Sequence, residues 1–151
     1  MMAKKILFVC TGNTCRSPMA VALLREMAPD LNLEIRSAGT AAAAGMPASS
    51  TAIEAMREVD IDLTGHRSAT LDGYMLEEAD LVFCMAERHR RHIVDWFKSL
   101  ENRVYLVREF DPERTDADYP NVPDPIGLDI DAYRRALTMI ERSLHEVIKI
   151  L

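Results

Sequence analysis

Two cysteines, a glycine and an arginine share one short segment, CTGNTCRSP, which runs from Cys10 to Pro18. An apolar run precedes this segment and a helix-like pattern follows it. At such a strand-to-helix turn, the loop N–H groups and the N-terminus of the helix together attract an anion. We expect Gly12 to permit a positive φ, Ser17 to cap the helix and Pro18 to occupy the first helical position. The segment therefore predicts a cradle for a phosphate-sized dianion.

The side chains of this segment suggest what would happen to such an anion. The guanidinium of Arg16 can hold two phosphate oxygens at once. Cys10 would then lie beneath the phosphorus, in a positive field that favours its thiolate form. Ser17 is placed to donate a hydrogen bond to the sulfur. We therefore predict nucleophilic attack by Cys10 on a bound phosphoryl group.

Two simpler interpretations of the segment are weaker. A dinucleotide or ATP cradle would require G-x-G-x-x-G or a Gly-Lys-Ser/Thr ending, and the sequence has neither. A lone cysteine at a strand end is usually a buried, inert thiol. The Cys-x5-Arg-Ser spacing makes that interpretation a poor one for Cys10.

Phosphoryl transfer also requires a group that protonates the leaving group and later activates water. Two Asp-Pro pairs compete for this role, Asp111-Pro112 and Asp124-Pro125. Asp111 follows the fourth predicted strand closely, whereas Asp124 lies just before the last predicted helix. Asp-Pro is also a common start of a turn, and from the residues alone that interpretation of Asp124 is about as good as the catalytic one.

The elements that must position these residues alternate between strand and helix. Apolar or alternating runs predict strands over 4–10, 33–37, 79–85 and 103–107. A segment whose apolar residues have helical spacing follows each of the first three strands. The last helix has an apolar face from Tyr133 to Leu151, with Asp129 or Asp131 as its cap. This order predicts one α/β domain over residues 1–151, with an open parallel sheet and a ligand site at the carboxyl ends of its strands.

Three segments fall between these elements. Residues 38–50 form a small-residue loop, and residues 110–127 are long enough to be a functional loop. The charged run ERHRRH, residues 87–92, favours a solvated helix face over an anion site.

Composition limits the possible partners. The net charge of −6 disfavours nucleic acid. The N-terminus has neither a cleavable signal nor a membrane span, so we expect a cytoplasmic protein without membrane contact. The three cysteines, Cys10, Cys15 and Cys84, show no metal-like clustering with histidine, and the proposed chemistry needs no metal or other cofactor.

The segment VCTGNTCRSPMA resembles the active-site loop of the low-molecular-weight protein tyrosine phosphatase family. Further segments that resemble the family follow in order along the whole chain: RSAGT, HRSATL, ADLVFCM and VPDPIG. The resemblance implies a three-layer sandwich around a four-stranded parallel sheet. It also implies a hydrolase of phosphate monoesters or phosphoramidates, acting on phosphorylated proteins through a phosphocysteine, with Asp124 as the general acid.

The resemblance assigns roles to the remaining site residues. Asn13 would stiffen the loop, itself held by Ser37 and His66, and Cys15 would guard Cys10 reversibly against over-oxidation. Inert packing remains a serious alternative for Cys15. The phosphate-binding loop then comprises Thr11, Gly12, Asn13, Thr14, Cys15, Arg16 and Ser17.

Departures from the tyrosine phosphatase pattern bear on the substrate. Alanines at 41–44 and the pair Ile126-Gly127 stand where the tyrosine enzymes have aromatic walls, and only Tyr119 is available as a replacement. At position 14 the chain has threonine and so resembles the bacterial protein-arginine phosphatase branch, whereas the tyrosine enzymes usually have an aliphatic residue there. The resemblance therefore favours phosphoarginine over phosphotyrosine.

Two alternatives come from other functional classes. A thioredoxin-linked arsenate reductase shares the loop but needs a redox cysteine pair after the third strand, where only Cys84 is present. A catalytically idle phosphate-binding module would keep the cradle without the chemistry, and the presence of Cys10, Arg16 and Asp124 gives it no support.

Overall fold

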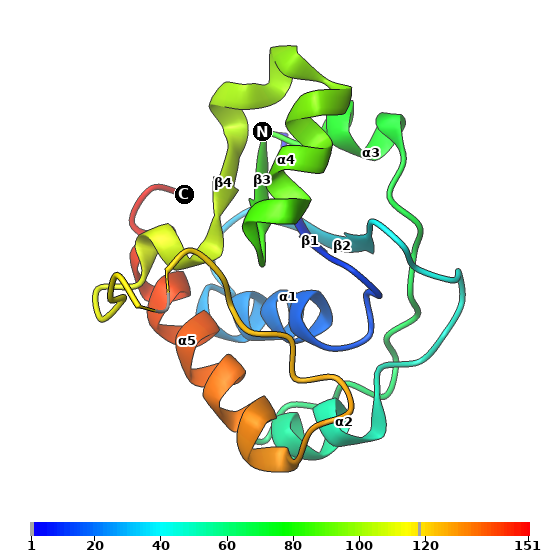
Figure 1. Cartoon of the computed structure of the whole chain (residues 1–151), viewed down its shortest axis with the longest axis vertical. Helices are drawn as coiled ribbons and strands as arrows, with labels where there is room; N and C mark the ends of the chain where they lie inside the picture. Colours follow the sequence, from blue (N-terminus) through cyan, green and yellow to red (C-terminus); the bar gives the residue numbers. More distant parts are fainter. Residues whose placement is uncertain (1, 118) are drawn as a thin grey trace.

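A four-stranded parallel sheet forms the centre of the molecule. The computed structural model describes residues 2–117 and 119–151. The strands are β1 (Lys4–Cys10), β2 (Leu33–Gly39), β3 (Leu81–Cys84) and β4 (Val104–Leu106), and they lie in the order β2-β1-β3-β4 (Figure 1). All three neighbouring pairs are parallel, so the carboxyl ends of the strands meet at one edge.

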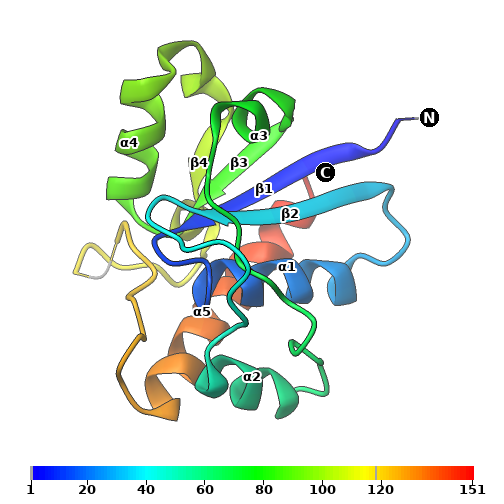
Figure 2. The same cartoon turned by 90° about the vertical axis from the view of Figure 1, so that its right-hand side faces the viewer.

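Helices cover both faces of the sheet (Figure 2). On one side lie α1 (Arg16–Met27) and α5 (Ile130–Ile148), with α2 (Ser50–Arg57) packed against α5. On the other side lie α3 (Gly73–Glu78) and α4 (Glu87–Trp96). Two 3₁₀ turns, Lys98–Arg103 and Val107–Phe110, flank β4. The predicted α/β class, a three-layer sandwich with a four-stranded parallel sheet, is confirmed.

The central strand β1 explains why its sequence is almost continuously apolar. Ile6, Phe8 and Cys10 face the core beneath α1 and α5, whereas Leu7 and Val9 face the core beneath α3 and α4. A strand that is buried on both faces cannot alternate between apolar and polar residues. Cys10 is therefore the last residue of a strand that is buried from Ile6 onward, on the side where α1 begins.

Asp129 caps the last helix, as one of the two predicted candidates. Its carboxylate accepts a hydrogen bond from the N–H of Ala132 at 3.1 Å. From there α5 lays an apolar face on the core through residues such as Leu137, Ile140 and Leu144, all of which are buried. The cap and the periodic face together fix where this helix starts and how it packs.

Other element boundaries differ from the prediction. Helix α1 begins at Arg16 with Cys15 as its N-cap, so Ser17 is not the cap and Pro18 lies further into the first turn. Helix α4 begins at Glu87, within the charged run that was expected on a helix face, but it ends at Trp96, so Leu100, which continues the apolar spacing of Ile93 and Trp96, lies in a 3₁₀ turn. The six-residue helix α3 was not predicted, because it is too short to show a helical period.

Candidate active site

The loop from Cys10 to Arg16 joins β1 to α1 at the carboxyl edge of the sheet. The loop that follows β2 lies against it, since the N–H groups of Thr40 and Ala41 donate to the carbonyls of Cys10 and Thr11, each at 2.9 Å. This approach requires a glycine at position 39, where a Cβ atom would collide with the carbonyl oxygen of Thr11. The small-residue segment after β2 therefore stabilises the loop from Cys10 to Arg16.

Asn13, rather than Gly12, adopts the positive φ in the loop. Its φ is +56°, and Gly12 is not among the residues with positive φ in the described chain. Asparagine tolerates the left-handed region better than most residues, because its short amide can bond locally. The prediction for Gly12 was wrong. The left-handed conformation is adopted by Asn13, whose side chain is held in place by its surroundings.

Four contacts hold Asn13. Its side-chain N–H₂ donates to Ser17 Oγ at 2.8 Å and to Ser37 Oγ at 2.9 Å, and its side-chain oxygen accepts from the N–H of Ala69 at 2.8 Å. The Nε2 of His66 donates to the carbonyl of Asn13 at 2.7 Å. The structure thus brings together the three residues that the sequence analysis grouped as supporting: Asn13, Ser37 and His66.

The sulfur of Cys10 lies among hydrogen-bond donors. The N–H of Asn13 donates to it at 3.3 Å, and Ser17 Oγ lies 2.9 Å away. Because Ser17 Oγ already accepts from Asn13, its own hydrogen is free to donate to the sulfur. Both contacts place a hydrogen-bond donor against the sulfur.

Arg16 and Asp124 meet beside this sulfur. The guanidinium of Arg16 is buried; its Nη1 donates to the carbonyl of Val122 at 2.9 Å, and its Nη2 lies 3.5 Å from Asp124 Oδ2. Burial lowers the pKa of Arg16, while the neighbouring charges of Cys10 and Asp124 raise it. The group remains a cation, since an arginine pKa starts so far above neutrality.

A cavity of about 160 Å³ opens between these groups. It is lined by Cys10, Thr11, Gly12, Thr14, Cys15, Arg16, Asp124 and Ile126. The side chain of Asp124 is 34% exposed at its edge, so this carboxyl faces both the cavity and solvent. A sulfur, a cation and a carboxyl group around one hollow can bind an oxyanion and exchange protons with it.

The other Asp-Pro pair lies elsewhere. Asp111 is fully buried, with one carboxylate oxygen 3.1 Å from Arg108 Nε and both oxygens accepting from Arg142 at 3.0 and 3.1 Å. Burial acts to raise the pKa of Asp111, but these hydrogen bonds and positive charges outweigh it and hold the pKa below its usual value. Asp111 therefore ties the 3₁₀ turn at 107–110 to α5 and does not reach the cavity.

Cys15 belongs to a polar cluster that the sequence analysis did not foresee. Its thiol donates to Ser49 Oγ at 3.4 Å, and its sulfur lies 3.4 Å from the hydroxyl of Tyr133. Burial and the contact with Cys15 raise the pKa of Tyr133 to about 12, so this hydroxyl stays protonated. Tyr133 had shown only as one member of the apolar face of α5. All three cysteines, Cys10, Cys15 and Cys84, are free thiols.

The charged run at 87–92 also contributes to the loop, through a residue that the prediction had placed on the surface. Arg88, Arg91 and His92 are exposed as expected, but His89 is buried. The N–H of Ala86 donates to His89 Nδ1 at 3.1 Å, so Nε2 carries the proton and donates to Thr11 Oγ1 at 2.8 Å. The only sequence signal for His89 is its place on the buried side of α4, four residues before Ile93.

The walls of the cavity are small. Thr14 and Ile126 line it, and no aromatic side chain does so among the described residues. Tyr119, the one aromatic suggested as a wall, lines a different hollow beside Glu87 and Arg90. The entrance is therefore bounded by a hydroxyl and an aliphatic group.

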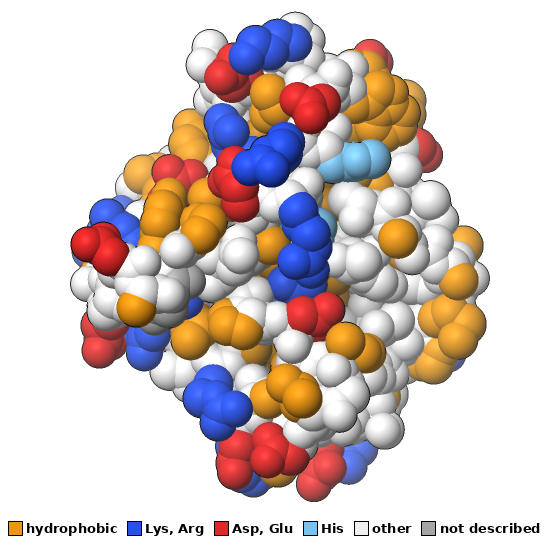
Figure 3. Space-filling view, viewed as in Figure 1, with side chains coloured by type: hydrophobic (Ala, Val, Ile, Leu, Met, Phe, Trp, Pro, Cys, Tyr) orange, Lys and Arg blue, Asp and Glu red, His pale blue; other side chains and the backbone are white. Residues whose placement is uncertain are grey.

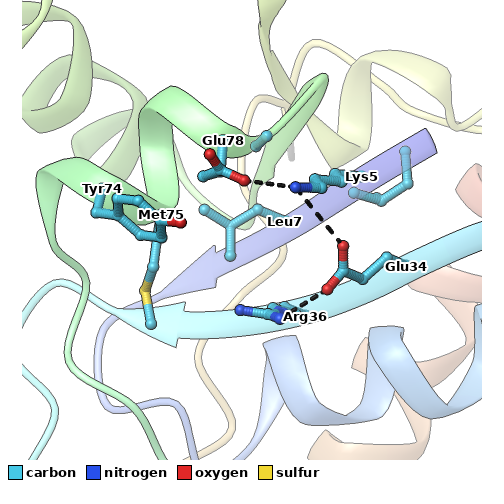
Figure 4. Close-up of a pocket in the computed structure, with 9 residues that line it drawn as sticks. Lys5, Leu7, Glu34, Arg36, Tyr74, Met75 and Glu78 are labelled. Atoms are coloured by element: carbon cyan, nitrogen blue, oxygen red, sulfur yellow. Dashed lines mark hydrogen bonds and ion pairs between the residues drawn. The ribbon is translucent and has the colours of Figure 1, made fainter. Parts of the chain in front are cut away.

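A second hollow of about 170 Å³ lies between β1, β2 and α3 (Figure 4). Its charged side chains neutralise one another, since Lys5 pairs with Glu78 and Glu34, and Arg36 pairs with Glu34 at 2.6 Å. No cysteine or histidine lines it. It therefore offers neither a nucleophile nor an unbalanced charge.

Within residues 2–117 and 119–151, no group of three or more His, Cys, Asp or Glu side chains is arranged to hold a metal ion. No helix in this part of the chain is long and apolar enough to cross a membrane.

Comparison with known proteins places these features in context. The model of the low molecular weight phosphotyrosine protein phosphatase family matches residues 5–151. A protein-arginine-phosphatase of Bacillus subtilis is 38% identical over 146 residues, which cover 95% of this chain and 94% of that protein. A probable low molecular weight protein-tyrosine-phosphatase of Ralstonia solanacearum is 38% identical over 143 residues, which cover 95% and 92%. The structure of Vibrio vulnificus Wzb in complex with benzylphosphonate has a TM-score of 0.87 at 28% identity, and the match covers 98% of this chain and 99% of that one.

Proposed function

The chain belongs to the low molecular weight phosphotyrosine protein phosphatase family, and from that premise we propose that it hydrolyses phosphoarginine in proteins through a phosphocysteine at Cys10. The observation that carries the proposal is the meeting of Cys10, Arg16 and Asp124 around one small cavity. Each supplies something that phosphoryl transfer needs: a nucleophile, a cation for the phosphoryl oxygens and a proton donor.

In the first step, the Cys10 thiolate attacks the phosphorus and the bond to the leaving group breaks. Arg16 and the loop N–H groups stabilise the charge on the phosphoryl oxygens, and the fixed geometry of Asn13 keeps those groups in place before substrate arrives. The carboxyl of Asp124 gives its proton to the departing nitrogen or oxygen. The contact between Arg16 Nη2 and Asp124 Oδ2 keeps this carboxyl near the cavity.

In the second step, water attacks the phosphocysteine. The Asp124 carboxylate, having lost its proton, takes one from the water, and the S–P bond breaks to release phosphate and the thiolate. The hydroxyl of Ser17 stabilises the departing sulfur, which it contacts at 2.9 Å. Cys10, Arg16 and Asp124 are thereby returned to their starting states.

The cavity wall favours phosphoarginine over phosphotyrosine. A phenyl ring gains most of its binding energy from apolar and aromatic walls, and here one wall is the hydroxyl of Thr14 while the other is Ile126. A guanidinium is planar, polar and rich in donors, so a small polar side chain suits it better. The related sequences include both protein-arginine and protein-tyrosine phosphatases at equal identity, so the wall is the discriminating feature.

The experiment compares kcat/KM for two peptides of matched sequence, one carrying phosphoarginine and the other phosphotyrosine. We expect the natural enzyme to prefer phosphoarginine and Thr14→Ile to shift the ratio at least about tenfold toward phosphotyrosine, a change of roughly 1.4 kcal/mol in relative transition-state binding. Thr14→Ser is the matched control, because it keeps the hydroxyl. A natural preference for phosphotyrosine would contradict the substrate assignment.

The phosphocysteine is tested separately. Acid quenching during turnover of a labelled phosphopeptide should trap labelled protein, and Cys10→Ala should abolish the label. Loss of label in Cys10→Ala also excludes a module that only binds phosphate. If unaltered protein carries no label although it turns substrate over, the covalent route is wrong.

An arsenate reductase mechanism receives no support from the third cysteine. Cys84 is fully buried in β3, facing the core beneath α3 and α4, and burial raises the pKa of its thiol. It therefore lacks both the access and the thiolate character that disulfide exchange requires. Arsenate-dependent oxidation of thioredoxin by this protein would overturn that conclusion.

A further inference from the structure

Helix α4 presents cations to solvent next to the cavity. Its exposed residues are Arg88, Arg91, His92, Asp95 and Trp96, which recur at steps of three and four and so share one face. The two arginines lie in its N-terminal part and Asp95 lies in its last turn. Figure 3 shows Lys and Arg side chains over α4 and along a line below it, in the middle of this face of the molecule.

The charge of these arginines is not neutralised locally. Among the residues that the structure describes, neither Arg88 nor Arg91 forms an ion pair with an acidic side chain, whereas Arg16, Arg36, Arg108, Arg134 and Arg142 all do. Glu87 and Asp95 are the acidic residues of α4 itself. Two arginines without an acidic partner therefore lie side by side on one helix face, in a chain whose net charge is −6. Such a patch attracts anionic groups against the overall charge of the protein.

Arg88 connects this patch to the catalytic cavity. Its Nη2 donates to Thr11 Oγ1 at 3.3 Å, and Thr11 lines the cavity. The charge of Arg88, after burial, also acts to lower the pKa of Arg16 and of His89, so Arg88 interacts electrostatically with both groups. The cationic face of α4 thus begins at the rim of the hollow in which the phosphoryl group would be held.

We propose that Arg88 and Arg91 form a docking surface for acidic residues that flank the phosphorylated residue in the substrate protein. The inference rests on the proposed function, because the phosphoryl group held in the cavity fixes which flanking residues of the substrate face α4. Arg91 lies about 4.5 Å further along the helix than Arg88, given the rise of an α-helix. An extended peptide advances about 3.3 Å per residue, so acidic groups in the first few flanking positions can meet the two guanidinium groups.

Trp96 extends this surface beyond the charges. It is 51% exposed and packs against Phe97, with the ring centroids 4.9 Å apart. A substrate segment that is acidic near the phosphorylated residue and apolar further away fits both parts of the face. The occupant we propose is therefore an acidic segment of a phosphoprotein.

The test uses phosphopeptides of one sequence, phosphorylated on whichever residue the enzyme turns over faster. Two flanking positions on either the N-terminal or the C-terminal side carry Asp, Asn or Lys. At low salt we expect kcat/KM to be about three- to tenfold higher for Asp than for Asn on one of the two sides, and lower for Lys, as for a pair of exposed ion pairs. The preference should shrink as ionic strength rises.

The variants separate docking from catalysis. Arg88→Gln combined with Arg91→Gln should bring the Asp-to-Asn ratio close to one, and Arg88→Lys with Arg91→Lys should keep most of it. Arg36→Gln is the matched control, because it removes an exposed arginine from β2 (Figure 4) and should leave the ratio as it is. An equal rate for Asp and Asn peptides in the natural enzyme overturns the docking surface, and so does a preference that survives the double Gln variant. Absence of turnover for every peptide, the Asn series included, would instead overturn the proposed function.

Discussion

Ser17 is placed to act on the sulfur in the second chemical step rather than in the first. It accepts a hydrogen bond from Asn13 and is left with one hydrogen, which faces Cys10 Sγ at 2.9 Å. Thiolate is the leaving group only when the phosphocysteine is hydrolysed. The contact should therefore matter most in that step.

We expect Ser17→Ala to lower kcat about 10- to 100-fold, because a hydrogen bond to a charged group contributes about 1.5–3 kcal/mol. With an activated aryl phosphate, the slowed hydrolysis should appear as a burst of released phenol followed by a slower steady state. Stopped-flow absorbance measures both phases. Ser37→Ala is the control, since it removes another acceptor of the Asn13 amide but no contact with the sulfur. Equal losses in the two variants, without a burst in Ser17→Ala, would mean that Ser17 only supports Asn13.

Cys10 and Cys15 are free thiols that line the same cavity, and we propose Cys15 as the partner of an oxidised Cys10. Peroxide converts the Cys10 thiolate to a sulfenic acid, and attack by the Cys15 thiol then forms a disulfide and releases water. We expect peroxide-treated enzyme to regain most of its activity with dithiothreitol, and Cys15→Ser to regain little because its Cys10 passes on to the sulfinic acid. Intact-mass spectrometry distinguishes a loss of two hydrogens from a gain of two oxygens. Full recovery in Cys15→Ser would assign Cys15 to packing with Ser49 and Tyr133.

At the scale of elements, the two Asp-Pro pairs serve different segments. Asp124 lies in the loop before α5 and borders the cavity, whereas Asp111 joins the 3₁₀ turn at 107–110 to α5 through Arg108 and Arg142. Arg108 is completely buried. Removing the carboxylate from an ion pair that is buried on both sides is strongly destabilising, whereas a partly exposed carboxylate contributes less to folding.

Substitution of each aspartate by asparagine should separate the two roles. Asp111→Asn should lower the free energy of unfolding by about 3 kcal/mol or more, with little change in kcat for the molecules that remain folded. Asp124→Asn should lower that free energy by less, because Asp124 is 34% exposed and meets Arg16 through a single contact of 3.5 Å, and it should lower kcat most for substrates with poor leaving groups. Urea denaturation and a series of aryl phosphates measure the two effects. Normal hydrolysis of poor leaving groups by Asp124→Asn would remove it from the mechanism.

The elements were predictable where local pattern determines them. The two-sided burial of β1 follows from its unbroken apolar run, and α5 follows from its apolar period and the cap at Asp129. The helix α3 and the C-terminal end of α4 were not predictable, since a short helix has no period and the 3₁₀ turn after Trp96 continues the same apolar spacing. Similarly, Gly12 was the natural candidate for a positive φ. Asn13 adopts it instead, because side chains from β2 and α1, and the N–H of Ala69 in the loop before α3, hold its amide in place.

At the scale of the whole molecule, the site depends on contacts between distant segments, and these explain what the sequence left open. The chemistry of Cys10 and Arg16 was readable because their spacing lies within one turn. The contact of His89 with Thr11 spans 78 residues, and that of Cys15 with Tyr133 spans 118 residues. No local pattern encodes such pairs, so His89 was assigned to the surface and Tyr133 to the core.

The burial of His89 also couples the stability of the whole molecule to pH. Burial, then the positive charges of Arg16, Arg88 and His92, lower the pKa of His89 from 6.5 to about 3. Below pH 6.5 the unfolded chain binds a proton at this histidine and the folded chain does not. Stability should therefore fall as the pH is lowered from 6.5 toward 3, with a slope from this group of up to about 1.4 kcal/mol per pH unit.

The pKa of His66 is also lowered, chiefly by burial, so this second histidine adds to the slope in the same direction. The lowered pKa of Asp111 acts only below the usual 3.8 of an aspartate. Glu58 and Glu101, whose pKa values are lowered from 4.5 chiefly by hydrogen bonds from Arg134 and Lys98, contribute only below about pH 5.5. Urea midpoints between pH 6.5 and about 5.5 therefore report on the histidines. We expect the natural protein to lose stability steadily across this range and His89→Gln to lose less per pH unit, even though its stability at pH 7 is lower. Gln can still donate to Thr11 from its amide but has no proton to gain. The same slope in both proteins would show that His89 is protonated in the folded state, and the neutral imidazole that donates to Thr11 would then be wrong.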